Sequence, residues 1–143
     1  MSRREVAARP RIAVQSARFL GIFLVVLGVA GWYDLPVVGA HGYLAYNTTL
    51  HVAHLAIGLY LFCMSTTTET NSAVALFTVS GACLLFSAFS LWQLGSADEG
   101  GVLDYVLVSR NGEYLHLTLA IVAGVLGKCN TASTQLFGKS SRD

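Results

Sequence analysis

Four long stretches of the chain carry no charged residue, and polar or glycine-rich segments separate them. These stretches are Phe19–Tyr33, Asn47–Met64, Ser72–Leu94 and Tyr114–Gly127. A helix needs roughly 17–25 mostly apolar residues to cross the hydrocarbon core of a bilayer. The pattern therefore predicts four membrane-spanning helices, over about residues 16–33, 43–64, 73–94 and 111–127.

The composition supports a membrane location for these helices. The 143 residues are 54% hydrophobic and only 12% charged, whereas about a quarter of the residues of a soluble domain are charged. No low-complexity region or linker divides the chain. We expect a single membrane domain over residues 1–143, with basic N- and C-terminal tails and the lipid bilayer as its first partner.

Two segments of the chain resemble each other and suggest an internal repeat. Asn47–Gly58 and Asn111–Gly124 each set a His-Leu pair into an apolar run, with a polar residue three positions before the histidine. The pairs are His54-Leu55, preceded by His51, and His116-Leu117, preceded by Glu113. Helical residues three apart share one face. We predict an all-α antiparallel bundle of two helix pairs in parallel repeat, in which His54 and His116 lie at similar depth and approach each other.

The basic residues predict the orientation. Eight of the nine Lys and Arg residues lie toward the two termini, before or at the start of the first predicted helix or after the end of the fourth. Because cytoplasmic segments are enriched in Lys and Arg, both termini are expected in the cytoplasm, with the protein in a bacterial inner membrane. An alternative is that the basic start, Phe19–Trp32 and Val38-Gly-Ala40 form a cleaved secretory signal, which would leave three helices.

Polar residues within the predicted helices form a candidate site, which we call the polar notch. It comprises Asn47, His51 and His54 of the second helix, Ser80 and Ser87 of the third, and Glu113 and His116 of the fourth. A histidine or glutamate within a membrane is a functional-site hypothesis. The simplest interpretation is structural, because such side chains also hydrogen-bond between membrane helices.

Two functional interpretations remain open for this notch. His54, His116 and His51 are candidate ligands for haem iron or for the magnesium of a chlorophyll-type pigment, although no bound cofactor is the main expectation. Glu113 and the histidines could instead carry protons or ions. The sequence shows no arrangement of catalytic residues and no dedicated metal site, so we do not expect an enzyme. It also shows no nucleic-acid-binding motif.

The His-Leu segments also carry a resemblance to a known family. The chain resembles a family of small bacterial four-helix membrane proteins of unknown function. In that family the second and fourth helices carry segments of the form N-x-x-x-H-L-x-x-G. The chain departs from that pattern at His51, where the family often has Asn, and at Ala120, where it has Gly. A weaker similarity is to small four-helix subunits of respiratory oxidoreductases. The resemblance implies an integral membrane protein, and we expect a structural or accessory subunit of a larger membrane complex.

Overall fold

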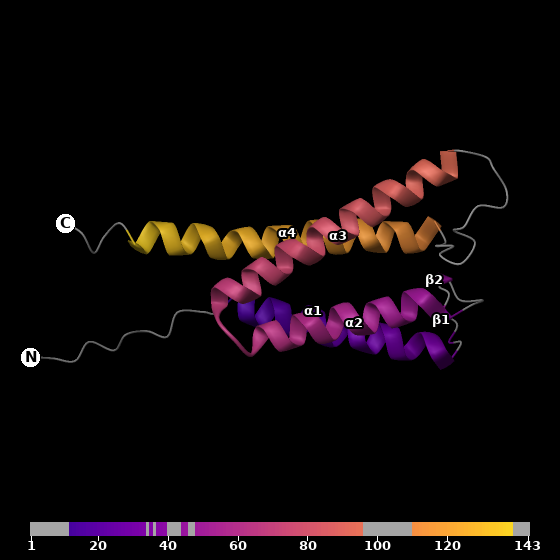
Figure 1. Ribbon diagram of the computed structural model, residues 1–143, viewed down its shortest axis with the longest axis horizontal. Helices are drawn as coiled ribbons and strands as arrows, with labels where there is room; N and C mark the ends of the chain where they lie inside the picture. Colours follow the sequence, from indigo (N-terminus) through magenta and orange to yellow (C-terminus); the bar gives the residue numbers. More distant parts are fainter. Residues whose placement is uncertain are drawn as a thin grey trace, which may run out of the picture.

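The computed structural model describes residues 12–33, 35, 37–39, 44–45, 48–95 and 110–138. Its architecture is helical (Figure 1). The helices are α1 (Ile12–Ala30), α2 (Thr48–Ser65), α3 (Glu69–Gly95) and α4 (Arg110–Gly138). A 3-10 turn, η1 (Gly31–Tyr33), follows α1, and two-residue strands β1 (Val38–Gly39) and β2 (Leu44–Ala45) pair in parallel.

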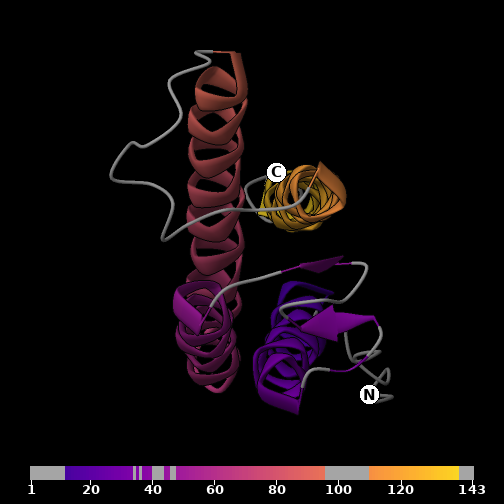
Figure 2. The ribbon, with the colours of Figure 1, turned by 90° about the vertical axis from the view of Figure 1, so that its right-hand side faces the viewer.

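The helices associate mainly in two pairs. α1 packs along α2, and α3 packs against α4, while α1 also contacts α3 and α4 and α2 contacts α3. α3 crosses α4 obliquely, and its C-terminal end lies away from the α1–α2 pair (Figures 1 and 2). Between their described residues, no Cα atom of α2 lies within 8 Å of a Cα atom of α4. Any link between these two helices is therefore made by side chains.

Three helical segments are long and apolar enough to cross a membrane, among the residues that the structure describes. They are Ile12–Tyr33, Thr48–Ser65 and Glu69–Ser90. The expectation of four such helices is therefore met only in part, since α4 is not among them. Polar residues occupy both ends of α4, and its charge-free stretch Tyr114–Gly127 would extend only about 21 Å as a helix.

Large apolar side chains face outward, and many polar side chains face inward. Phe19, Leu85 and Trp92 are 74%, 75% and 70% exposed, respectively. The buried polar residues are His51, His54, Ser65, Ser72, Ser80, Ser87, Glu113 and His116. A large outward apolar surface is unusual for a soluble monomer, but it suits a protein surrounded by lipid.

The starts of α2 and α3 differ from the predicted positions. α2 begins at Thr48 rather than near residue 43, because Leu44–Ala45 is extended and pairs with Val38–Gly39. α3 begins at Glu69 rather than near residue 73. Thr68 caps it, since the backbone N–H of Asn71 donates to Thr68 Oγ1 at 3.2 Å. Such a cap satisfies one of the unpaired N–H groups of the first turn.

The two outer ends of the helical chain also differ from the prediction. α1 begins at Ile12 rather than near residue 16, and α4 continues to Gly138 rather than ending near residue 127. The extension of α4, residues 128–138, is more polar than the apolar run it adjoins, whereas the extension of α1, Ile12–Gln15, is mostly apolar. Hydropathy identifies the part of a helix that lipid can cover, and a helix can continue into water beyond it.

Glycines allow α1 and α2 to approach closely. A Cβ atom added to Gly58 would lie 2.7 Å from the carbonyl oxygen of Gly21 and 2.7 Å from the backbone nitrogen of Val25. A Cβ on Gly28 would lie 2.8 Å from the carbonyl oxygen of His51. Because these neighbours are backbone atoms, no side-chain rotation could make room. Small residues permit such close packing between membrane helices.

Gly58→Ala is therefore expected to destabilise the protein by about 1–3 kcal/mol, the usual cost of overpacking a tight contact. The measurement is the free energy of unfolding in mixed micelles titrated with a denaturing detergent. Gly81→Ala is the matched control, because a Cβ at Gly81 meets nothing within 4 Å and alanine favours a helix. Equal stability of the two variants would contradict a close α1–α2 contact at Gly58.

Candidate functional site

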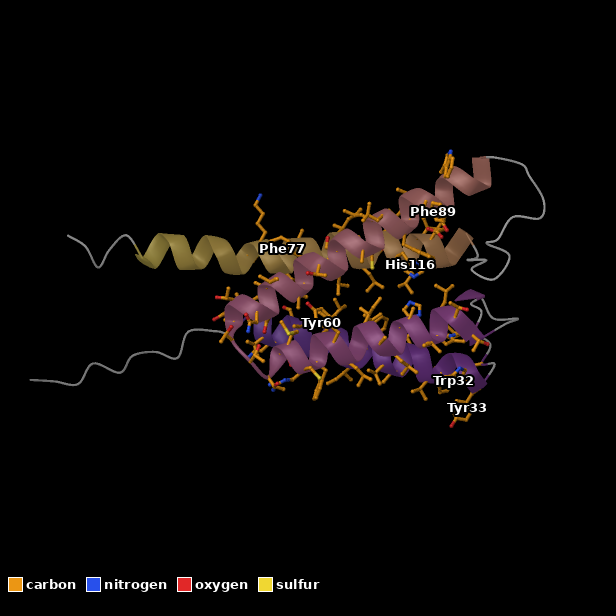
Figure 3. The ribbon with its side chains drawn as sticks, viewed as in Figure 1. Trp32, Tyr33, Tyr60, Phe77, Phe89 and His116 are labelled. Carbon is orange, nitrogen blue, oxygen red and sulfur yellow. The ribbon has the colours of Figure 1, made fainter. Side chains whose placement is uncertain are left out.

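The histidines of the two His-Leu pairs lie together in the interior. His54 on α2 and His116 on α4 have ring centroids 5.5 Å apart, and their ring planes differ by 4°. The two side chains are 3% and 5% exposed, respectively. Figure 3 shows His116 between α4 and α2. The expectation that these two residues approach each other is confirmed, and the pair spans the gap between two helices whose backbones stay apart.

Each ring of this pair is held by its own helix. His54 interacts with the backbone of Leu50, and His116 interacts with the backbone of Gly112. Each partner lies four residues earlier, where an imidazole N–H can donate to a helical carbonyl. Phe86 of α3 packs edge-on against His116, with ring centroids 5.0 Å apart. These contacts fix the rings in a defined orientation.

A pocket of about 200 Å³ lies beside the histidine pair and receives side chains from all four helices. Its lining is mostly aliphatic. The lining residues are Leu24, Leu50, Ala53, His54, Ile57, Ala82, Cys83, Phe86, His116 and Leu119. Pockets for drug-sized ligands usually measure about 300–1,000 Å³. A haem or chlorophyll-type macrocycle would therefore require α2, α3 and α4 to move apart.

His51 has a different position from His54 and His116. It is 3% exposed, one turn before His54 on α2, but it does not line the described pocket. Its ring occupies the space beside Gly31, where a Cβ atom would overlap the ring atoms. His51 therefore packs α2 against η1 at the end of α1, and the structure does not bring it into the His54–His116 pair.

The remaining residues of the polar notch are dispersed. Ser80 Oγ donates to the carbonyl oxygen of Ala120 at 2.7 Å and joins α3 to α4. Glu113 is 2% exposed and Ser87 is 0% exposed, and neither Ser87 Oγ nor the Glu113 carboxylate oxygens have a hydrogen-bond partner among the described residues. Asn47 lies outside the described residues.

Several residues that shape this region are not among the site residues predicted from the sequence. Cys83 and Phe86 line the pocket, and Ser72 is fully buried and donates to the carbonyl oxygens of Met64 and Thr68. A signal for the first two existed, because Val79, Cys83 and Phe86 recur at helical spacing on one face of α3. Hydropathy alone does not distinguish that face from the lipid-facing one.

The described residues contain no group of three or more His, Cys, Asp and Glu side chains that could hold a metal ion. Comparison of the chain with protein-family models, with curated proteins and with solved structures finds no match. The chemical possibilities of the site therefore follow from its own geometry, a pair of parallel imidazole rings beside an apolar pocket.

We expect the His54–His116 contact to contribute measurably to stability. A double-mutant cycle with His54→Ala and His116→Ala should give a coupling free energy of about 0.5–1.5 kcal/mol, the range for aromatic pairs. The readout is again detergent-induced unfolding. The control cycle pairs His54→Ala with Thr118→Ala, since Thr118 is exposed on α4 and donates to Tyr114. A coupling near zero for the histidine cycle would contradict the contact.

Proposed function

We propose that the chain is a small integral membrane protein that serves as a structural or accessory subunit of a larger membrane complex. In this proposal α1 to α4 form an antiparallel four-helix bundle, built as two helix pairs in parallel repeat. The pairing of α1 with α2 and of α3 with α4 supports this arrangement. The outward apolar and inward polar side chains support a bilayer environment.

The proposed orientation places both termini in the cytoplasm of a bacterium, at its inner membrane. The start of α1 and the end of α4 lie at the same end of the molecule (Figure 1), and six of the nine Lys and Arg residues of the sequence lie beyond these two points. α4 would complete the bundle despite its short apolar stretch, because its polar His116 and Glu113 are buried against protein. The resemblance of the His-Leu segments to small bacterial four-helix membrane proteins, which we expect from the sequence alone, agrees with this proposal.

The outward face of α3 gives the main support for the accessory role. Gly81, Leu85, Ala88 and Trp92 recur at steps of four, three and four, so they share one side of the helix. Leu85 and Trp92 are 75% and 70% exposed, and a Cβ on Gly81 would meet nothing within 4 Å. Small residues that alternate with large ones let a neighbouring helix approach closely. This face suits a transmembrane helix of a partner subunit.

A cofactor-carrying function is the competing proposal. Its support is that two imidazole rings lie close together in the interior, with centroids 5.5 Å apart, but the rings are stacked and their in-plane nitrogens do not point toward a shared metal ion. The pocket of about 200 Å³ opposes it, since a tetrapyrrole does not fit without separation of the helices. The accessory role therefore remains the better supported of the two.

A visible absorption spectrum separates these two proposals. Protein purified in mild detergent from its native membrane should show no tetrapyrrole absorption band, because the pocket is too small for the macrocycle. Quantification of the pigment against protein gives the occupancy. A near-stoichiometric tetrapyrrole that is lost in both His54→Ala and His116→Ala would overturn the accessory proposal in favour of a cofactor-binding protein.

Photocrosslinking tests the partner-facing surface directly. A photoreactive amino acid in place of Leu85 should give a discrete protein adduct in native membranes, whereas the same substitution at Leu59 should label lipid. Leu59 is the matched control because it is a leucine 55% exposed on α2. The adduct is sized by denaturing gel and identified by mass spectrometry. An adduct of two copies of this chain, or no discrete adduct at Leu85, would contradict a partner subunit at this face.

A further inference from the structure

The pocket beside the histidine pair opens to the outside between α2 and α3. Most of its lining residues are buried, whereas Ala53 and Ile57 of α2 and Ala82 and Phe86 of α3 reach the surface. A short turn joins α2 to α3 at one end, and the two helices diverge toward the other end (Figures 1 and 2). The pocket is therefore a crevice, with its entrance between these two helices and its inner end against α1 and α4.

The inner wall of this crevice offers almost nothing to a polar ligand. Both ring nitrogens of His54 and Nδ1 of His116 are buried, and both residues have partners of their own. Leu24 of α1 and Leu119 of α4 are further members of the inner wall. Because a polar group that is buried without a hydrogen bond costs free energy, this wall selects a hydrocarbon.

The entrance of the crevice adjoins the surface that lipid covers. On α2, Tyr60 lies one turn beyond Ile57 on the same side of the helix, and on α3, Phe89 lies one turn beyond Phe86. Tyr60 and Phe89 are both exposed. Walls that face a void lose the dispersion contacts that atoms filling it would provide. In a bilayer, the molecules that reach this entrance and can restore those contacts are hydrocarbon chains.

We propose that this crevice holds part of an acyl chain of a bilayer phospholipid. The chain enters between α2 and α3 and packs against the carbon atoms of the inner wall, while the headgroup stays outside. An apolar cavity of about 150 Å³ holds benzene, which has six carbon atoms, so the pocket of about 200 Å³ takes about eight carbon atoms of a chain. The chain thereby fills the space between the α1–α2 pair and the α3–α4 pair. The proposal rests on the membrane location of the helices and not on the accessory role.

The test uses the purified full chain in phosphatidylcholine vesicles that contain a phosphatidylcholine with a photoreactive diazirine in one acyl chain. After irradiation, mass spectrometry of peptides locates the adducts. Cys83 and Cys63 are a matched pair of thiols, because Cys83 is 6% exposed and lines the pocket, whereas Cys63 is exposed on α2. The proposal predicts adducts on both thiols. Adducts on Cys63 with none on Cys83 would show that no chain enters the crevice, and would overturn the proposal.

Alanine variants show whether the Cys83 adduct arises through the entrance. Ala82→Leu narrows the entrance and should lower the ratio of Cys83 to Cys63 adducts about tenfold, since filling roughly 60 Å³ of a cavity changes an equilibrium by that factor. Ala53→Leu fills the crevice from α2, away from the reporting thiol, and should give the same loss. Ala88→Leu is the matched control, because Ala88 is exposed on α3 but does not line the pocket, and it should leave the ratio unchanged. An unchanged ratio in both pocket variants would place the label elsewhere and overturn the proposal.

Discussion

The hydrocarbon core of a membrane offers no hydrogen-bond partner to a polar group. This constraint determines which side chains face outward and which face the interior of the protein. Among the described residues, apolar side chains as large as Leu85 and Trp92 lie on the outside, while three histidines and four serines are buried within. In water the same arrangement would be costly, because it exposes apolar surface and buries polar groups. In lipid it is the favourable arrangement, and it leaves the polar groups to form contacts between helices.

These contacts differ in kind from one helix pair to the next. α1 and α2 are joined by close backbone approach at Gly21 and Gly58, which depends on the absence of side chains. α3 and α4 are joined in part by the hydrogen bond from Ser80 to the carbonyl of Ala120. α2 and α4 meet through side chains alone, at the His54–His116 pair. The two histidines therefore join α2 and α4, which have no close backbone contact with each other. A pocket remains beside the two rings.

The sequence predicts the helical architecture and the approach of His54 to His116, because both follow from periodic features. Charge-free runs mark the apolar parts of the helices, and the two His-Leu pairs place one histidine on each of two helices. It does not predict the helix ends, since Thr68 as a cap and the β1–β2 pairing depend on local hydrogen bonds. It also groups His51 with the other histidines. The separation of His51 depends on the direction of one ring toward Gly31, which spacing along a helix cannot reveal.

The central claim is that His54 and His116 face each other in the membrane interior. Solid-state NMR of protein labelled with ¹³C and ¹⁵N at histidine, reconstituted in lipid bilayers and assigned with single substitutions, measures this contact directly. We predict a through-space correlation between the two rings, consistent with a centroid separation of 5.5 Å, and weak contact of either ring with lipid acyl chains. Strong correlations of either ring with acyl chains, together with no correlation between the rings, would contradict the account.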